Sequence, residues 1–288
     1  MIDEFLNAVL CDHVGCRNIN KSQRVTGGCI NETAQIQAGS NLYFLKWNTS
    51  EKLDLFDKEV LGLRLLAQNS EIKTPDILGV GTKDKKSYLL LEWINGGVIS
   101  DQFWASLGGQ LAIMHQTDAG KFGLDHDNYI GELPQSNAQH ERWTDFFITE
   151  RLEPQLKFAK DTHLVDKPIL DGFQKLYNCL DRLVPKESPS FIHGDLWSGN
   201  FLCNANQKPV LIDPAVHYGH RETELAFTTM FGGFQQIFYD VYMEQYPLEK
   251  GFEERIHIHN LYPLLVHLNL FGSSYLNEIK RTLKKFTF

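Results

Sequence analysis

The chain has 288 residues, 42% of them hydrophobic and 22% charged, which is enough apolar material for one large domain or two lobes. Its 36 acidic and 28 basic residues give a net charge of −8, which argues against a nucleic-acid partner or an anionic-membrane surface. The lack of a long apolar run and of a signal-like start, with five irregularly spaced cysteines, favours a reduced, cytoplasmic protein that does not bind a membrane.

The first ninety or so residues are typical of strands around one helix. Residues 33–38 and 41–47 are short strand-like runs joined by a Gly-Ser pair, which indicates a hairpin. A helix over about 52–68 carries apolar residues at helical spacing. Residues 87–94 predict a largely buried strand, which the sequence Asn-Gly-Gly at 95–97 ends.

The remainder of the chain is richer in helical patterns. Residue 100 or 101 can cap a helix with a clear apolar face, and further helices are expected around 143–158, 169–183, 222–246 and 254–282. Residues 191–192 and 210–212 are short apolar strands that each lead into a polar cluster. We therefore predict an α+β fold of two lobes, residues 1–94 and 95–288, with a ligand held between them.

Three polar residues that follow the two short strands carry the strongest chemical signal. Asp195 lies in the segment His-Gly-Asp-Leu-Trp-Ser-Gly-Asn, which ends at Asn200, and the strand at 210–212 leads into Asp213. Phosphoryl transfer needs a carboxylate that accepts the proton of the attacking hydroxyl, and oxygen ligands that hold Mg²⁺ against the phosphates. We predict that Asp195 is the catalytic base and that Asn200 and Asp213 are the metal ligands of an ATP-dependent kinase; a polar turn between core strands is the alternative.

This pattern resembles the aminoglycoside phosphotransferase and choline kinase branch of the protein-kinase-like fold. The Leu-Trp-Ser-Gly-Asn form, with Trp197 as its distinguishing residue and Asp-Pro-Ala starting at Asp213, resembles the fructosamine/ketosamine kinase family. Family-like strings also occur at 27–31, 122–131, 219–222, 231–234 and 267–272, so the resemblance covers nearly the whole chain. It implies a small β-rich N-terminal lobe with one main helix and a larger, mostly helical C-terminal lobe.

The resemblance gives roles to residues of the first lobe. Gly27 and Gly28 precede a strand, where backbone N–H groups could approach the ATP phosphates, and oxidation of the neighbouring Cys29 is then expected to block ATP binding. Lys46 lies on a mostly apolar strand and would reach the α- and β-phosphates. Glu59, at the edge of the helical stripe, is its expected ion-pair partner or else a solvated residue.

The segment Glu92-Trp93-Ile94 resembles the kinase hinge, whose backbone binds adenine. By this resemblance the carbonyl of Glu92 and the amide of Ile94 would contact the base of ATP. A buried strand that ends in a turn is the plainer interpretation, and the two are compatible.

Candidates for the acceptor site come from the second lobe. Trp197, His267 and Asn269 are expected to line the sugar pocket. The histidines of this helical region, His259 among them, are expected to pack rather than to bind a metal. Glu224 stands where the family more usually has an aspartate, which leaves its pairing open.

The resemblance implies an enzyme that uses ATP and Mg²⁺ to phosphorylate the 3-hydroxyl of a ketosamine, such as a ribulosamine or fructosamine on the amine of lysine. The acceptor would be a sugar-amine small molecule or a glycated protein, and the unstable 3-phosphate would shed the sugar, giving deglycation. The alternatives are a kinase of aminoglycosides or choline, a non-catalytic nucleotide-binding protein, and a protein kinase. The short stretch from Asp213 to Leu225 has no room for a long activation loop, which argues against a protein kinase and predicts constitutive activity.

Overall fold

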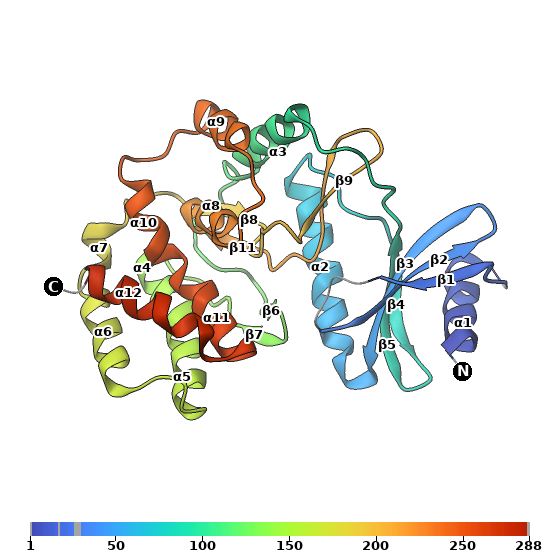
Figure 1. Cartoon of the computed structure of the whole chain (residues 1–288), viewed down its shortest axis with the longest axis horizontal. Coiled ribbons are helices and arrows are strands. Elements are labelled where there is room, and N and C mark those ends of the chain that lie inside the picture. The colour runs from blue at the N-terminus through green and yellow to red at the C-terminus, as the bar shows by residue number, and fades with distance from the viewer. Residues whose placement is uncertain (1, 17, 26–29, 287–288) are drawn as a thin grey trace. The chain divides into compact units, whose positions relative to one another are not determined.

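The computed structural model describes residues 2–16, 18–25 and 30–286 (Figure 1). The chain divides into two compact units: unit 1 comprises Met1–Phe103 and Gly199–Pro214, and unit 2 comprises Trp104–Ser198 and Ala215–Phe288. The predicted division into 1–94 and 95–288 instead counts residues 95–103 and 199–214 with the second lobe. The roles assigned to the two lobes stay a prediction.

Unit 1 is built on a five-stranded antiparallel sheet with the strand order β1-β2-β3-β5-β4. The strands are β1 (Lys21–Arg24), β2 (Glu32–Ala38), β3 (Asn41–Thr49), β4 (Ile77–Lys83) and β5 (Lys86–Glu92). The expected hairpin is present as β2 and β3, and Gly39 adopts a φ of +62° at its turn. A second, two-stranded hairpin, β9 (Phe201–Cys203) with β10 (Pro209–Leu211), also belongs to this unit.

Two helices cover opposite faces of the sheet of unit 1 (Figure 1). The expected helix is α2 (Leu53–Asn69), preceded by one 3-10 turn (Ser50–Lys52), and its apolar stripe packs on Leu89 and Leu91 of β5. The other helix, α1 (Ile2–Val14), packs on Leu90 of the same strand, because successive strand residues face opposite sides. The sequence prediction lacked α1, although its buried residues recur at helical spacing: Phe5, Leu6, Val9 and Leu10.

Unit 2 is mostly helical. Its helices are α3 (Asp101–Met114, with its first three residues counted in unit 1), α4 (Trp143–Phe146), a π-helix (Phe147–Leu152), α5 (Glu153–Asp161), α6 (Lys167–Tyr177), α7 (Leu180–Leu183), α8 (Arg221–Met230), α9 (Gln236–Gln245), α10 (Phe252–His259), α11 (Leu261–Phe271), a 3-10 turn (Ser273–Tyr275) and α12 (Leu276–Phe286). Two small antiparallel sheets complete it: the hairpin of β6 (Asn128–Ile130) with β7 (Leu133–Gln135), and the pair of β8 (Ser190–Ile192) with β11 (His217–Gly219), which are distant in the sequence.

Glycines divide two stretches that the sequence predicted as long helices. The expected helix over 222–246 is two helices, α8 and α9, separated at Gly232 and Gly233, whose φ angles are +69° and +96°. The stretch 254–282 is broken twice, at Asn260 between α10 and α11 and at Gly272, which ends α11 at φ +91°. Glycine adopts this left-handed region without the steric cost that a Cβ imposes, so it ends helices readily. Within the described part of the chain, no helix is both long and apolar enough to cross a membrane.

Candidate active site

In unit 1, Lys46 is a buried cation between two carboxylates. It is 4% exposed, its Nζ lies 2.7 Å from Glu59 Oε1 of α2, and it also contacts Asp213 Oδ1. Burial lowers the pKa of Lys46, but the charges of Asp213 and Glu59 more than offset this effect and raise the pKa above its ordinary value. The ammonium therefore stays charged, and the expected pair with Glu59 is joined by a third member, Asp213.

Glu59 and Asp213 share the ammonium of Lys46. Burial raises the pKa of Glu59 to about 7; the charge of Lys46 opposes this rise and that of Asp213 adds to it. The predicted phosphate loop, Gly27 and Gly28 with Cys29, lies outside the described residues.

Asn200 and Asp213 flank one end of the hairpin formed by β9 and β10. The backbone N–H of Ile212 donates to the carbonyl of Asn200 at 3.1 Å, directly beyond the β9–β10 pairing. Asn200 is 5% exposed, and Asp213 has a φ of +53°, a region that residues other than glycine adopt mainly where the surroundings impose it. Carboxylate and amide oxygens are the hard donors that Mg²⁺ prefers, so this pair fits the predicted metal.

A glycine on α2 allows close packing next to Asp213. A Cβ added at Gly62 would lie 2.9 Å from Cγ of Pro214, which is closer than ordinary van der Waals contact. Glycine weakens a helix interior by about 1 kcal/mol, so its presence here reflects the space available rather than helix propensity. No sequence pattern singled out Gly62, because its importance depends on a residue 152 positions away in the chain.

The predicted hinge begins at the end of β5. The carboxylate of Glu92 pairs with Lys73 at 2.9 Å and accepts the backbone N–H of Asp76 at 3.3 Å. The backbone N–H of Glu92 in turn donates to the carbonyl of Asp76 at 2.9 Å. These bonds fix the strand end from which Trp93 and Ile94 continue, both half-buried. The binding of adenine by this segment stays a prediction.

In unit 2, Asp195 follows β8 in a turn that only glycine permits. The φ of Gly194 is +83°, and a Cβ there would lie 2.1 Å from the carbonyl oxygen of Ala215. His193 is fully buried, and its Nδ1 accepts the backbone N–H of Asp195 at 3.2 Å. Its carbonyl accepts the N–H of Ala215 at 2.9 Å. His193 therefore orients the backbone that carries Asp195.

Glu224 of α8 fixes the same turn by accepting hydrogen bonds from its backbone. Its buried carboxylate accepts the backbone N–H groups of His193 at 3.1 Å and Gly194 at 2.8 Å, and the ring N–H of His115 Nε2 at 3.0 Å. The other nitrogen of His115 is 2.9 Å from the hydroxyl of Tyr242. Burial raises the pKa of Glu224, but the hydrogen bonds and charge of His115 outweigh it, so the pKa is lowered and the carboxylate stays ionised. The pairing that the sequence left open is thus with the backbone of the Asp195 turn.

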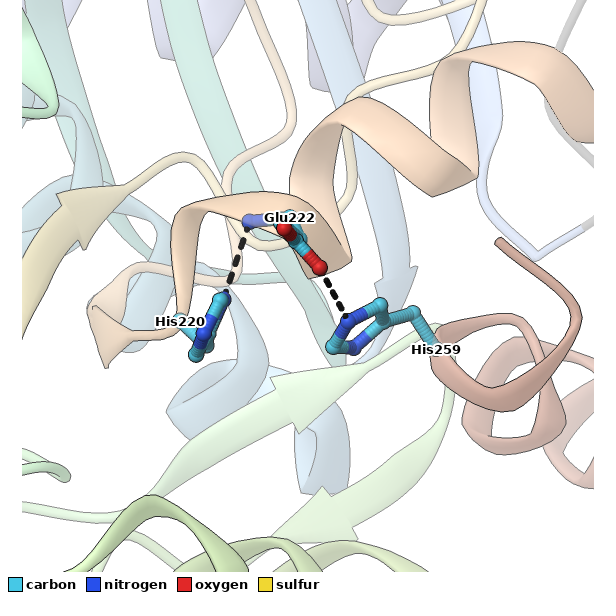
Figure 2. Close-up of side chains that lie close together, drawn as sticks. All are labelled: His220, Glu222 and His259. Atoms are coloured by element: carbon cyan, nitrogen blue, oxygen red, sulfur yellow. Dashed lines mark hydrogen bonds and ion pairs between the residues drawn. The ribbon is translucent and has the colours of Figure 1, made fainter. Parts of the chain in front are cut away.

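A second buried group of titratable residues lies at the start of α8 (Figure 2). Glu222 binds Arg255 through both oxygens, at 2.7 and 2.5 Å, and His259 Nε2 at 3.0 Å, while the backbone N–H of Glu222 donates to His220 Nδ1 at 3.3 Å. Burial raises the pKa of Glu222, but these partners outweigh it and lower the pKa to about 2. The spacing of His220, Glu222 and His259 would suit a metal, but Arg255 already neutralises the carboxylate and His220 caps the helix. This group is structural.

The structure brings together two of the three predicted acceptor residues. The rings of Trp197 and His267 both pack on Phe231, with centroid distances of 5.8 and 5.0 Å. Asn269 instead donates through its amide to the backbone carbonyl and side chain of Gln155, at 3.0 and 2.8 Å, and so ties α11 to α5. Phe231 was not among the predicted site residues, although it opens one of the family-like strings.

The sequence matches known proteins along nearly its whole length. A sequence model described as fructosamine kinase matches residues 3–287. A protein named "Probable ketoamine kinase" from Lactiplantibacillus plantarum is 40% identical over 271 residues, which cover 93% of this chain and 95% of the relative. The chloroplastic protein-ribulosamine 3-kinase of Arabidopsis thaliana is 37% identical over 268 residues, which cover 89% of this chain and 79% of the relative.

Solved structures agree in fold. A crystal structure from Haemophilus somnus 129PT, described as a "putative fructosamine-3-kinase", superposes with a TM-score of 0.87 at 29% identity and covers 98% of this chain and 97% of its own. An aminoglycoside phosphotransferase bound to ADP and hygromycin B superposes with a TM-score of 0.63 at 14% identity, covering 97% and 98%, which shows the shared fold alone. The chain therefore belongs to the fructosamine kinase family, and the predicted kinase-like fold and activity, an ATP-dependent kinase of ketosamines, are confirmed.

Proposed function

We propose that the chain transfers the γ-phosphoryl group of ATP to the 3-hydroxyl of a ketosamine, a ribulosamine or fructosamine carried on an amine such as that of lysine. The observation that carries the reaction type is the buried group of Lys46, Glu59 and Asp213, in which one cation is fixed between two carboxylates. The sugar and its 3-hydroxyl follow from family membership and from the ribulosamine 3-kinase among the relatives. The unstable 3-phosphate would then release the sugar, in the cytoplasm, as a step of deglycation.

The residues of unit 1 serve the nucleotide in this proposal. Lys46 neutralises phosphate oxygens of ATP and is itself held by Glu59. Asn200 and Asp213 would hold Mg²⁺, which when bound supplies positive charge against the phosphates. Backbone groups of Gly27 and Gly28 would bind phosphate oxygens, and those of residues 92–94 would bind adenine.

Asp195 acts on the acceptor substrate in this proposal. Its carboxylate accepts the proton of the 3-hydroxyl as that oxygen forms a bond to the γ-phosphorus, while the bond from the γ-phosphorus to the bridging oxygen breaks and ADP leaves. The turn fixed by His193, Gly194 and Glu224 holds the backbone of Asp195 in place before the acceptor binds. Such preorganisation lowers the entropic cost of aligning the reacting groups.

The test is ATP consumption by the purified enzyme with ribulosamines, fructosamines, aminoglycosides and choline as acceptors. We expect turnover with the ketosamines, a phosphate on their O3 by ³¹P NMR, and loss of turnover when Mg²⁺ is chelated. Turnover confined to aminoglycosides or choline would show that the proposed acceptor is wrong. Phosphate on another hydroxyl of the sugar would overturn the assigned position while keeping the substrate class.

A further inference from the structure

Five aromatic side chains of unit 2 form a continuous row that starts at the catalytic segment. Trp197, two residues after Asp195, packs on Phe231 with a centroid distance of 5.8 Å, and Phe231 packs on His267 at 5.0 Å. His267 packs in turn on Phe271 at 5.4 Å and Tyr275 at 5.1 Å. We refer to these five residues as the aromatic row.

Large apolar side chains of the aromatic row are exposed to solvent. Phe231 is 42% exposed and Phe271 is 53% exposed, whereas the other three members are half-buried. Burying an aromatic side chain stabilises a fold, so the exposure of these rings leaves stabilising free energy unused. A single exposed apolar residue needs no explanation, but a connected row that reaches a catalytic segment is typical of a binding surface.

The loop after α8 holds Phe231 against the catalytic segment. Gly232 and Gly233 both have left-handed φ angles, and a Cβ at Gly233 would lie 2.8 Å from Cβ of Ser198. The chain next to Phe231 therefore packs on the residue that follows Trp197. A side chain other than hydrogen at Gly233 would push this loop away, and Phe231 with it.

The aromatic row carries no formal charge near neutral pH. His267 donates from Nδ1 to the carbonyl of Pro263 at 2.7 Å, and burial lowers its pKa, so the ring is neutral. Its Nε2 is then an acceptor. The π faces of Trp197, Phe231 and Phe271 attract cations and pack on methylene groups, but they have no strong partner for a sugar's several hydroxyls.

We propose that the aromatic row binds the amine-bearing arm of the acceptor, so that the enzyme selects ketosamines on lysine side chains over those on short amines. This inference rests on the proposed function and names the substrate class of the same site. The linking nitrogen of such a ketosamine is a secondary amine that is protonated near neutral pH, and four methylene groups follow it. The ammonium suits the faces of Trp197 and Phe231 nearest the catalytic segment, and the methylene stem suits the continuation toward Phe271.

The test uses fructosamines or ribulosamines made on methylamine, on butylamine and on Nα-acetyl-lysine amide. The wild-type enzyme should show a KM that falls as the stem lengthens. Phe271→Ala should raise the KM for the lysine derivative about five- to tenfold, the size of one lost aromatic contact, and leave kcat, the KM for ATP and the KM for the methylamine derivative within about twofold. The matched control is Phe158→Ala on α5, which removes a phenylalanine that is 43% exposed and outside the row.

The outcomes separate this inference from the proposed function. Normal turnover with one KM across the three stems, or an equal KM increase for all three in Phe271→Ala, would overturn the role of the aromatic row alone. Absence of turnover with every ketosamine would overturn the proposed function and the row together. Thermal unfolding of both variants within a few degrees of the wild-type Tm shows that the KM values report on binding rather than on folding.

Discussion

At the scale of single residues, the contacts of Lys46 and Asp195 differ in kind. The ammonium of Lys46 is held by side-chain carboxylates, Glu59 and Asp213, so its position depends on charge. The turn of Asp195 is held through the backbone N–H groups of Asp195 and Gly194, which donate to the side chains of His193 and Glu224, so its position depends on hydrogen bonds to the backbone. A substitution that removes the Asp195 carboxylate therefore leaves these backbone hydrogen bonds in place.

Asp195→Ala is expected to lower kcat about 10²–10⁴-fold, because the 3-hydroxyl loses its proton acceptor. The Kd for ATP should stay nearly unchanged, since the residues proposed to bind the nucleotide are Lys46, Glu59 and Asp213. Single-turnover kinetics and nucleotide titration measure the two quantities. Asp161→Ala, at the exposed end of α5, is the control and should match the wild type. A variant at Asp195 with near-normal turnover would remove this residue from the role of base.

At the scale of elements, the N-terminal part of α8 positions the turn that carries Asp195. Glu224 places an ionised carboxylate under two backbone N–H groups, and His115 and Tyr242 extend that contact to α3 and α9. Leaving either N–H buried without an acceptor would cost about 1–3 kcal/mol. The turn is therefore tied to helices outside its own few residues.

Gly194→Ala tests whether this turn can accept a side chain at Gly194, and Gly120→Ala is its matched control. Both glycines have a φ near +80°, but a Cβ at Gly194 would lie 2.1 Å from the carbonyl oxygen of Ala215, whereas a Cβ at Gly120 would meet nothing within 4 Å. Gly120→Ala should lose about 1 kcal/mol of unfolding free energy from backbone strain alone. Gly194→Ala should lose at least about 2 kcal/mol more and most of its kcat, as measured by urea unfolding and steady-state kinetics. Equal losses in the two variants would show that the turn tolerates the clash.

Sequence patterns predicted some elements well and could not reach others. Lys46 and Glu59 could be paired because each lies on an element whose apolar periodicity shows which face is buried. The contacts of Glu224 could not be predicted, because its carboxylate accepts hydrogen bonds from backbone N–H groups, which every residue but proline has. The helices over 222–246 and 254–282 were predicted too long, because apolar periodicity continues past the breaks at Gly232 and Gly233, at Asn260 and at Gly272. The aromatic row depends on one of those breaks, at Gly232 and Gly233, so it too could not be foreseen.

At the scale of the whole molecule, unit 2 contains buried groups that make its stability depend on pH. Burial lowers the pKa of His220 to about 4, with the neighbouring His259 adding to this effect and Glu187 opposing it. His217 is likewise shifted well below its usual range, first by burial and then by Arg151. These imidazoles are neutral in the folded chain, and unfolding lets them take up protons in acid.

Stability is expected to fall as the pH is lowered from about 6.5 to 4. In this window the unfolded chain binds a proton at His220 that the folded chain does not, so the unfolding free energy falls by up to about 3 kcal/mol. Glu222, with a folded pKa of about 2 and an ordinary value of 4.5, continues the loss from 4.5 toward 2. Urea unfolding at several pH values measures this slope. His220→Asn keeps a helix-capping side chain without a titrating ring and should flatten the slope between pH 6.5 and 4; an unchanged slope would contradict the assignment.

The division of unit 1 along the chain has a consequence for how the protein is made. Its sheet and α2 lie within the first 103 residues, but Asn200, Asp213 and the β9–β10 hairpin reach it only from residues 199–214. A chain emerging from the ribosome therefore cannot finish its N-terminal unit until more than two thirds of the protein has been synthesised. Until then Lys46 has Glu59 but not Asp213, so the nascent N-terminal segment would remain without its second carboxylate. A fragment cut at residue 103 would stay in that same incomplete state.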